Sequence, residues 1–394
     1  MLFGNEYLQE SVTRPDTTSP GAAPCLLGAT ATAEGRRNGE GTVGVDPAYS
    51  GFNCPTLLRT TEPTMVVLIT GGAGFVGANV VRYVAESGRE AVCFDRAAGD
   101  ADPLREWYFE DVSNRVHKHE GDVTALGDLR EAIDHYDVEG IVHAATITPS
   151  PAAERDRANA ILDVNLLGTA NVLDAARDGG VDRVVYVSSG AVYRNNSELE
   201  AIDEYDALNL NGLYSISKHG SERLCQLYEN RYGLETVTAR LGWVYGHMER
   251  PTSSREHMSS VFEAMRAALE GETLRVNDLD RRRDWTHSQD VARGIRSLLT
   301  ADSLSEPVYN LTAGEGYSMR EVVDRVAELV GGIEVERVDS RSAANVPVSS
   351  TSRRGHLDAA RLARETGFTP AFILEDGLAE YRDWFRRARS AGVL

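Results

Sequence analysis

Residues 65–77, MVVLITGGAGFVG, decide the fold of this chain. The apolar run over residues 66–69 has the length and the β-branched content of a strand buried on both faces. The glycines that follow predict a tight turn at Gly71, backbone N–H groups open to a pyrophosphate at Gly74, and close helix packing at Gly77. Because the helix N-terminus adds partial positive charge, the stretch predicts a dinucleotide site. The alternative is a plain strand–turn–helix connection, since the spacing is GxxGxxG and not the more usual GxGxxG.

A second strand is predicted over residues 91–94. It ends in Asp95, roughly 20 residues past the glycines, where a carboxylate accepts hydrogen bonds from an adenosine ribose and repels a 2′-phosphate. This position favours NAD as the cofactor. Arg96 beside it leaves NADP as the alternative.

Composition sets the broad class of the protein. The 394 residues are 42% hydrophobic, which suits one large α/β domain with a smaller part, or two domains. No apolar run approaches the roughly 18 residues of a membrane span. The N-terminus lacks the basic start and apolar segment of a secretory signal, so we expect a cytoplasmic protein.

The charge balance narrows the partners. The net charge is −19, and the only lysines are Lys118 and Lys218. Such a field disfavours nucleic acid and anionic membranes as partners. An acidic, lysine-poor surface is typical of halophile proteins, where molar salt shortens the screening length to about 3 Å or less. We hypothesise a salt-accumulating host, and undiminished activity and fold after dialysis to low salt would contradict this.

The chain divides into three parts. Residues 1–64 are rich in Gly, Thr, Pro and Ala without periodicity, so we expect a disordered extension, with a mis-assigned translation start as the alternative. Residues 65–246 alternate strands and helices, which predicts a Rossmann-type, doubly wound parallel sheet that binds NAD and carries the catalytic residues. Residues 247–394 have a looser pattern and predict a smaller C-terminal α/β lobe that mainly binds substrate. A short strand at 308–311 and a helix at 374–389 belong to this lobe in our prediction.

The sharpest chemical motif is YSISK at residues 214–218. Tyr214 and Lys218 are four residues apart and share one face of the predicted helix. An ammonium a few ångströms away favours the phenolate of a tyrosine, so Tyr214 becomes a proton shuttle. Ser189, at the end of a predicted strand, would hydrogen-bond the reacting oxygen as an alcohol becomes a carbonyl, while hydride passes to the nicotinamide.

YxxxK also arises by chance as an exposed helix pair. The choice of lysine argues for catalysis, because a chain that almost everywhere uses arginine keeps a lysine here. A compact, titratable ammonium serves at this position in a way that a planar guanidinium does not.

With these motifs the chain resembles the extended short-chain dehydrogenases/reductases of the NAD-dependent epimerase/dehydratase family, from residue 65 to the C-terminus. The segments that carry the resemblance are TGGAGFVG, FDR, GDV, HAA, VNLLGT, VSSGAVY, YSISK, RLGWVYG, RRRDWTHSQDVARG and YNLTAGEGYS.

The resemblance implies NAD as the cofactor and roles for further residues. Lys218 would also bind the nicotinamide ribose, and Ser188 would pack or contact the cofactor. The expected catalytic residues are Ser189, Tyr214 and Lys218. The expected cofactor contacts are Gly71, Gly74, Phe75, Val76, Gly77, Asp95, Arg96, Asp122, Val123, Ala144, Ala145, Asn165, Ser188, Tyr214 and Lys218. The expected substrate contacts are Thr146, Ser189, Trp243 and Arg283.

Arg283 would hold the phosphate of a sugar nucleotide, as the resemblance implies. The alternative is a solvated or structurally paired arginine cluster formed with its neighbours Arg281 and Arg282.

Three departures from the family pattern bear on the substrate. Where nucleotide-sugar epimerases usually place an asparagine that touches the substrate, this chain has Trp243, which either stacks on a sugar or fills the core. The usual proline after the next glycine is His247. Gly190 and Ala191 replace the Asp-Glu pair of dehydratases, so 4,6-dehydration is not expected.

We therefore expect a nucleotide-sugar C4 epimerase, similar to UDP-glucose 4-epimerases, in which NAD is regenerated within each turnover. The alternative is an NAD-dependent dehydrogenase of a free sugar or a small hydroxy acid, which Trp243 favours. A third class is a catalytically silent NAD-binding scaffold. The intact Ser189, Tyr214 and Lys218 speak against that class.

Metal and partner expectations complete the prediction. No metal is expected, because His117, His119 and Glu120 alternate on a predicted strand without further ligands. His143 is interpreted as a satisfied histidine at the end of a strand. The resemblance implies a homodimer through helices around 158–176 and 214–232.

Overall fold

The computed structural model of the protein describes residues 65–193, 200–349 and 355–394. The extension predicted for residues 1–64 lies outside these ranges. None of the described helices is long and apolar enough to cross a membrane.

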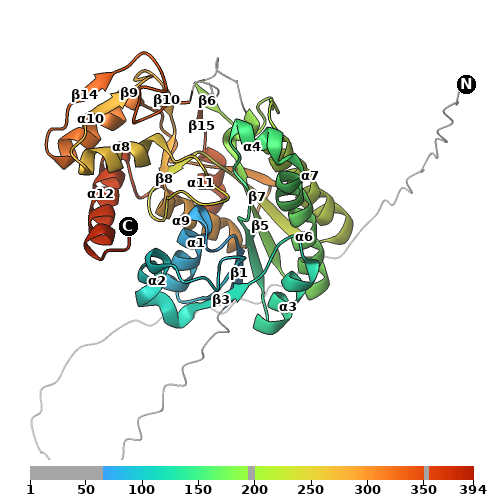
Figure 1. Cartoon of the computed structure of the whole chain (residues 1–394). Coiled ribbons are helices and arrows are strands. Elements are labelled where there is room, and N and C mark those ends of the chain that lie inside the picture. The colour runs from blue at the N-terminus through green and yellow to red at the C-terminus, as the bar shows by residue number, and fades with distance from the viewer. Residues whose placement is uncertain (1–64, 194–199, 350–354) are drawn as a thin grey trace, which may run out of the picture. The chain divides into compact units, whose positions relative to one another are not determined.

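Seven parallel strands form the main sheet, in the order β12-β7-β5-β4-β1-β2-β3 (Figure 1). Along the chain these are β1 (Val66–Thr70), β2 (Glu90–Asp95), β3 (Val116–Glu120), β4 (Gly140–His143), β5 (Arg183–Ser189), β7 (Glu235–Leu241) and β12 (Val308–Leu311). The order of the first six is that of the doubly wound dinucleotide-binding fold, and β12 extends it by one strand. The predicted Rossmann-type sheet is confirmed.

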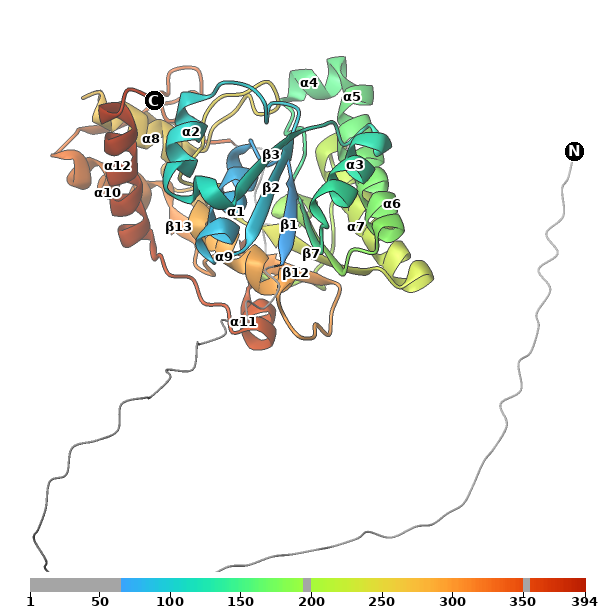
Figure 2. The same ribbon diagram turned by 90° about the horizontal axis from the view of Figure 1, so that it is seen from below.

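Helices cover both faces of this sheet (Figures 1 and 2). On one face α1 (Phe75–Glu86) packs against α9 (Ser288–Leu299). The other face carries α3 (Leu126–Tyr136), α6 (Gly168–Gly179) and α7 (Leu213–Tyr232).

Side chains of each strand alternate between two apolar cores, as strand geometry requires. Val67 and Ile69 of β1 join the core shared with α1 and α9, whereas Leu68 joins the core shared with α3 and α6. Both faces of β1 are therefore buried, which is why its sequence is a continuous apolar run.

The connection from β4 to β5 is less regular than a single helix. It comprises α4 (Pro151–Asp156), α5 (Ala158–Leu162), a π-helical turn (Asp163–Leu167) and then α6. The connection from β2 to β3 contains α2 (Pro103–Phe109) and a 3₁₀ helix (Glu110–Arg115).

A smaller lobe is built from short strand pairs and three helices. The pairs are β8 (Trp243–Tyr245) with β11 (Trp285–His287), β9 (Leu274–Val276) with β14 (Val335–Arg337), β10 (Arg282–Arg283) with β13 (Tyr317–Ser318), and β6 (Ala201–Ile202) with β15 (His356–Leu357). The helices are α8 (Ser260–Leu269), α10 (Met319–Val330) and α12 (Leu374–Ser390). A capping box formed by Ser318 and Glu321 begins α10.

The boundary predicted at residue 246 does not separate the sheet from the lobe. β12 pairs with β7 at the edge of the main sheet, and α9 packs against α1, although both elements follow residue 246. The strand predicted at 308–311 is correct, but its assignment to the smaller lobe is not.

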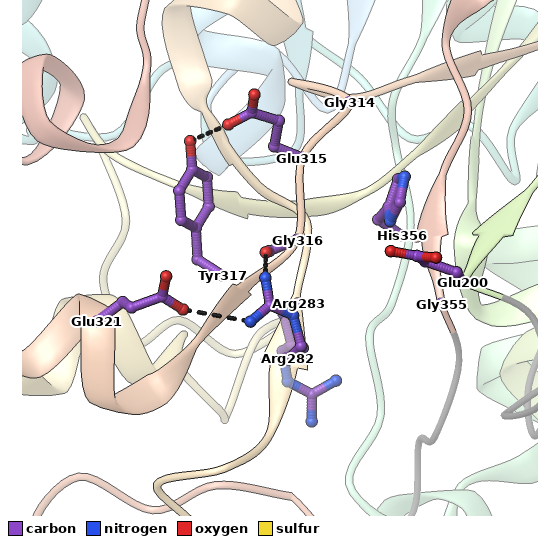
Figure 3. A pocket seen from close by; sticks show the side chains of 10 residues that line it. All are labelled: Glu200, Arg282, Arg283, Gly314, Glu315, Gly316, Tyr317, Glu321, Gly355 and His356. Atoms are coloured by element: carbon purple, nitrogen blue, oxygen red, sulfur yellow. Dashed lines mark hydrogen bonds and ion pairs between the residues drawn. The ribbon is translucent and has the colours of Figure 1, made fainter.

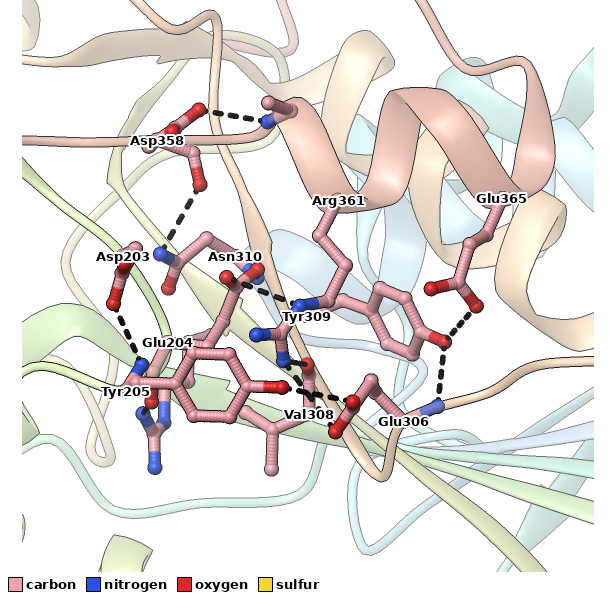
Figure 4. Close-up of polar contacts among 12 residues, drawn as sticks. Asp203, Glu204, Tyr205, Glu306, Val308, Tyr309, Asn310, Asp358, Arg361 and Glu365 are labelled. Atoms are coloured by element: carbon pink, nitrogen blue, oxygen red, sulfur yellow. Dashed lines mark hydrogen bonds and ion pairs between the residues drawn. The ribbon is translucent and has the colours of Figure 1, made fainter.

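Polar contacts hold α11 (Ala360–Thr366) against the edge strand β12 (Figure 4). The Tyr309 hydroxyl donates to Glu365 (2.6 Å), and Arg361 donates to the carbonyl of Val308 (3.0 Å) while its guanidinium lies over the Tyr205 ring. An open strand edge invites pairing with other chains, and α11 limits that pairing here.

Candidate active site

A cleft of about 500 Å³ lies at the carboxyl ends of β1, β2, β4 and β5. Between β1 and β4 the order of strands reverses, and ligands of such sheets bind at this reversal. The glycine-rich turn, the ends of these strands, α7 and the segment 248–260 form its walls.

The glycine-rich turn has the geometry of a cradle that side chains would fill. Gly71 has a φ of +68°, and a Cβ there would stand 2.7 Å from Ala145. A Cβ on Gly77 would stand 2.0 Å from the carbonyl oxygen of Gly71, so only glycine lets α1 start this close to β1. The turn thus fits the pyrophosphate of a dinucleotide, whose charge the N-terminus of α1 would complement.

The adenosine end of the cleft carries acidic residues. The Asp95 carboxylate accepts hydrogen bonds from the backbone N–H groups of Ala73 (3.3 Å) and Ala97 (3.0 Å), which fixes it at the end of β2. Arg96 is exposed, with its guanidinium 3.9 Å from the Asp122 carboxylate. Asp95, Arg96 and Asp122 all line the cleft, so two carboxylates and one guanidinium stand at this end. The two carboxylates favour a ribose hydroxyl over a 2′-phosphate.

Most of the predicted site residues line this one cleft. They are Gly71, Gly74, Phe75, Val76, Gly77, Asp95, Arg96, Asp122, Val123, Ala144, Ala145, Thr146, Ser188, Ser189, Tyr214, Lys218, Trp243 and Arg283. Residues from several strands and helices, far apart in the sequence, thus meet at one place.

Asn165 lies behind the cleft wall and does not line it. Its amide oxygen accepts from the backbone N–H of Ile147 (2.8 Å), and its amide nitrogen donates to the carbonyl of Ile147 (3.0 Å) and to Ser217 (3.3 Å). The π-helical turn brings this side chain between the β4 loop and α7. Asn165 therefore positions Thr146 and the YSISK helix and does not itself touch the cleft.

Ser189, Tyr214 and Lys218 meet at the centre of the cleft. The Tyr214 hydroxyl has the hydroxyls of Ser189 and Thr148 as hydrogen-bonding neighbours. The Lys218 ammonium nitrogen donates to the carbonyl of Val187 (2.8 Å) and lies 5.8 Å from the centre of the Tyr214 ring. The predicted constellation is thus assembled, with Thr148 as a fourth member that the sequence did not reveal.

Burial dominates the electrostatics of this centre. Burial raises the pKa of Tyr214, and the hydroxyls of Ser189 and Thr148 oppose that rise only in part. Burial also lowers the pKa of Lys218 to about 7, although Glu222 favours the ammonium. This differs from the prediction that the Lys218 ammonium favours the phenolate. Desolvation dominates the Tyr214 pKa, and the nearby charge that lowers it is that of Arg255.

A buried ion pair between Glu222 and Arg240 lies beside the catalytic centre. The Glu222 carboxylate lies 2.7 Å from the Arg240 guanidinium and accepts from the Ser188 hydroxyl (2.6 Å). Burial alone would raise the pKa of Glu222, but hydrogen bonds from Arg240, His219 and Ser188 lower it to about 2. Ser188 is therefore held by Glu222, which lies one helical turn beyond Lys218. Glu222 follows Lys218 at the same four-residue spacing that separates Lys218 from Tyr214. This spacing could have identified Glu222 in the sequence.

The segment 248–260 forms the wall opposite α7. The backbone N–H of Thr148 donates to the carbonyl of Ser254 (3.0 Å), so the segment is tied to the β4 loop beside Tyr214. Arg255 of this segment pairs with the buried Glu249 (2.7 Å) and lies over the Phe75 ring. Arg250 pairs with Asp102 of the β2 connection. The residues of this segment could not be predicted from the sequence, because they belong to no local sequence motif.

Trp243 and Arg283 form a stacked pair in the substrate half. The Arg283 guanidinium carbon lies 3.7 Å from the centre of the Trp243 ring, and an Arg283 nitrogen donates to the carbonyl of Ser349 (3.0 Å). Trp243 also packs edge-on against Trp285. Trp243 packs against the core, as one alternative predicted, and it also lines the cleft. Its stacking on a sugar stays a prediction.

A second cavity of about 610 Å³ adjoins Arg283 (Figure 3). Arg282 in its wall is paired with Glu321 (3.4 Å) and donates to the carbonyl of Gly316. Glu200, Glu315 and His356 also line it. Arg281 pairs outside with Asp278 (2.8 Å), so of the arginine run only Arg283 lines both cavities.

The interpretation of His143 as a satisfied histidine is confirmed. His143 is buried and accepts or donates hydrogen bonds with Thr70 (2.7 Å) and Thr169 (3.0 Å). Burial lowers its pKa to about 3. His117 is paired with Glu90 (3.0 Å), and neither it nor His119 belongs to a cluster of metal-ligating side chains in the described residues.

Comparison with known proteins agrees with this arrangement. The sequence model of the NAD dependent epimerase/dehydratase family matches residues 67–312. A putative UDP-glucose 4-epimerase of Methanocaldococcus jannaschii is 26% identical over 327 residues, which cover 82% of this chain and 98% of that protein. A dTDP-glucose 4,6-dehydratase of Streptomyces griseus is 30% identical over 333 residues, which cover 83% and 96%.

Among solved structures, the UDP-glucose 4-epimerase of Thermus thermophilus in complex with NAD has a TM-score of 0.69 and 28% sequence identity. The match covers 82% of this chain and all of that chain.

Proposed function

Because this chain belongs to the NAD dependent epimerase/dehydratase family, we propose that it is an NAD-dependent C4 epimerase of a nucleotide sugar. The observation that carries the proposal is that one cleft contains both a cofactor-binding half and a substrate-binding half. One half has the dinucleotide cradle and the Ser189–Tyr214–Lys218 centre, and the other is lined by Arg250, Arg255, Arg283 and Arg341.

The catalytic centre supports reversible oxidation of a hydroxyl group. As a phenolate, Tyr214 takes the proton of the substrate hydroxyl, and Ser189 hydrogen-bonds the same oxygen as it becomes a carbonyl. Burial disfavours the phenolate, and the positive charge of a bound nicotinamide would offset that effect. Lys218, with a pKa lowered by burial to about 7, exchanges a proton at neutral pH without a large free-energy cost. NAD held by the glycine-rich turn would supply the acceptor for the hydrogen of the same carbon, as hydride, and would return it.

Inversion at C4 requires that the keto sugar rotate in the cleft, so that it is reduced on its opposite face. Tyr214 and Ser189 then serve the other face of the sugar with the same two hydroxyl groups, so no second acid or base is needed. A cleft of about 500 Å³ is within the size range that holds a small-molecule ligand.

The arginines favour a nucleotide sugar over a free sugar. Four arginines line the cleft, but Arg250 and Arg255 already pair with Asp102 and Glu249. The preference for a nucleotide sugar therefore rests on Arg283 and Arg341, in a chain whose net charge is −19. A diphosphate supplies the negative charge that such a wall attracts. The 4,6-dehydration carried out by some relatives is not proposed, because Gly190 and Ala191 stand where dehydratases of the family have Asp and Glu.

A net dehydrogenase of a free sugar or small hydroxy acid is the second candidate. Trp243, where family epimerases have an asparagine, favours it because an aromatic face stacks on a sugar ring without a nucleotide. A silent NAD-binding scaffold is not favoured, since Ser189, Tyr214 and Lys218 line the cleft together.

The test is incubation of purified protein with UDP-glucose, UDP-galactose and free aldoses in turn, with NADH absorbance and sugar products both followed. The proposal predicts interconversion of the two UDP-sugars without accumulation of NADH. Sustained NADH accumulation with a free sugar would establish the dehydrogenase instead.

We further propose a homodimer through α6 and α7. Leu167, Ile216 and Leu227 on these elements are about half exposed, and Ile216 and Leu227 are about three helical turns apart on one face. Light scattering should give the mass of a dimer, and Leu227→Glu should give a monomer. Ile373→Glu, at another exposed apolar residue, is the matched control and should remain dimeric. A monomeric wild-type chain would contradict this proposal.

We also propose that the protein works in the cytoplasm of a salt-accumulating host. Its negative charges repel one another, and molar salt screens that repulsion. Circular dichroism and epimerase activity should both decline as salt is removed by dialysis.

A further inference from the structure

Two histidines and a glutamate converge on one point away from the cleft. His247 follows β8, His287 ends β11, and Glu380 lies in α12. The Nε2 atoms of His247 and His287 lie 2.7 Å and 3.2 Å from the same Glu380 oxygen, Oε2. These ligand atoms all lie within 4.8 Å of one another, and the described part of the chain holds no other such group of three. We call this the His–Glu cluster.

Aromatic packing fixes the direction of both imidazole rings. The His247 ring is stacked on Trp384 with centroids 4.7 Å apart, and the His287 ring packs against Phe372 at 4.5 Å. The two imidazole planes stand at 83° to each other. Packing thus fixes both rings. Nε2 of His247 is hydrogen-bonded to Glu380 (2.7 Å), whereas the buried Nε2 of His287 lies 3.2 Å from the same oxygen without a hydrogen bond.

The cluster lies inside this aromatic shell, with a cation on one side. The His247 and His287 rings are buried, and the Glu380 side chain is partly exposed. The guanidinium of Arg387 lies 3.7 Å from the other carboxylate oxygen, Oε1, and is largely exposed. Oε2 is therefore the carboxylate oxygen nearest both imidazoles. Imidazole nitrogen and carboxylate oxygen are donors that bind metal ions.

The spacing of the donor atoms approaches that of a tetrahedral site. Zinc binds imidazole nitrogen and carboxylate oxygen at about 2.0–2.2 Å, which places neighbouring donors about 3.3 Å apart. The two nitrogen–oxygen separations, 2.7 Å and 3.2 Å, reach this value if the Glu380 side chain retreats by roughly half an ångström. The two imidazole nitrogens lie within 4.8 Å of each other and must reach the same separation on binding. Glu380 is partly exposed, so its side leaves room for a water as fourth ligand.

We propose that His247, His287 and Glu380 form a zinc site that fastens α12 to the loops after β8 and β11. Two imidazoles and one carboxylate are a ligand set that zinc uses, and its affinity for such ligands exceeds that of Mn²⁺ or Fe²⁺. None of the three residues lines the catalytic cleft, so the zinc has a structural role. The site is independent of the proposed function.

Binding leaves the number of bound protons unchanged. Each imidazole moves its proton from Nε2 to Nδ1, and Nε2 then ligates the metal. The new proton on Nδ1 of His247 has the Tyr108 hydroxyl oxygen at 3.4 Å as acceptor. The Gln289 amide, whose nitrogen faces Nδ1 at 3.4 Å, must turn over to present its oxygen. His287 gives up a long contact, 3.4 Å, with the backbone N–H of Gln289. The zinc bonds outweigh the loss of that contact.

The experiment uses the full chain without an affinity tag, stripped with a chelator and then dialysed against zinc alone. Elemental analysis should find one zinc per chain, and the thermal midpoint should rise relative to the stripped protein. His247→Gln and Glu380→Gln should each lower zinc affinity by more than about 100-fold. Epimerase activity, measured in parallel, should remain in the stripped protein.

Two matched controls exclude other zinc ligands. His117→Gln removes an exposed histidine that also contacts a glutamate and should retain zinc. A chain with Cys25→Ser and Cys54→Ser should retain zinc too. If the cluster variants fail to fold, the visible absorption spectrum of the wild-type chain with bound cobalt tests the proposal instead. A four-coordinate cobalt site absorbs visible light intensely. Failure to bind zinc or cobalt, or zinc binding that both cluster variants keep, would overturn the proposal.

Discussion

The two halves of the cleft are built in different ways. The cofactor half is made of short motifs that each follow their own strand: the glycine-rich turn after β1, Asp95 at the end of β2 and Asp122 after β3. The substrate half is assembled from β8, β10 and the segment 248–260, which only the tertiary fold brings together. The residues that bind a cofactor common to many enzymes therefore lie in short stretches of sequence. The residues that select the substrate come from distant segments, which only tertiary packing brings together.

The largest effect is expected at Tyr214, where the two halves meet. Tyr214→Phe removes the proton shuttle but keeps the ring, so turnover should fall by about 10²–10⁴-fold. NAD affinity, measured by fluorescence titration, should change little. Turnover that is unchanged in this variant would remove Tyr214 from the chemistry and with it the link between the halves.

A pH-dependent effect on stability is expected at Lys218. Its pKa falls from 10.5 to about 7 on folding, so the unfolded chain binds the proton more tightly and the wild type loses stability as pH falls from 10.5 towards 7. Lys218→Met removes this penalty. The cofactor-free variant should therefore be more stable relative to the wild type at pH 6 than at pH 9, by a few kcal/mol.

Urea unfolding at the two pH values measures this difference. The matched control for loss of a lysine is Lys118→Met, which changes the other lysine of the chain, an exposed side chain on β3 that pairs with Glu106. A stability difference for Lys218→Met that is equal at pH 6 and pH 9 would contradict the account of a desolvated ammonium.

In the cofactor half, Asp95→Ala should weaken NAD binding by about 10-fold or more, because hydrogen bonds to a charged group are lost. Asp95→Asn keeps an acceptor and removes the charge, so it should retain more NAD affinity and bind NADP better than the wild type does. Calorimetric titration with both dinucleotides provides the comparison. Equal NAD affinity in wild type and Asp95→Ala would place the adenosine ribose elsewhere.

In the substrate half, the expected effect is smaller. Trp243→Asn removes the ring on which Arg283 stacks, a contact worth about 0.5–2 kcal/mol, so the KM for the sugar nucleotide should rise by roughly 2–30-fold. Trp243→Phe keeps an aromatic face and should lie between the two. NAD affinity should be the same in all three proteins. A KM that does not change would restrict Trp243 to packing.

The sheet was predictable because its signals are local. β1 and β2 are mostly apolar runs, and Gly71 and Gly77 occupy places where only glycine fits. The sequence could not place β12, since a short apolar run at 308–311 does not say which sheet edge it joins. Only its pairing with β7 settles that question.

The site was predictable in part for the same reason. Tyr214 and Lys218 lie on one helix, so their spacing carried the information. Thr148 and Arg255 lie on two segments that are joined by an isolated β-bridge, in which the Thr148 N–H donates to the Ser254 carbonyl. No periodic pattern in the sequence indicates such a contact. The sign of the Tyr214 pKa shift was also missed, because the extent of burial depends on the folded cleft and not on helical spacing.

The most direct test of the central claim follows a hydrogen atom through one turnover. UDP-galactose that carries deuterium at C4 is incubated with the enzyme, and the product is examined by NMR spectroscopy. The account predicts UDP-glucose with the deuterium still at C4, because the hydrogen leaves and returns within one closed cleft. Deuterium lost to solvent, or found in released NADH, would contradict it.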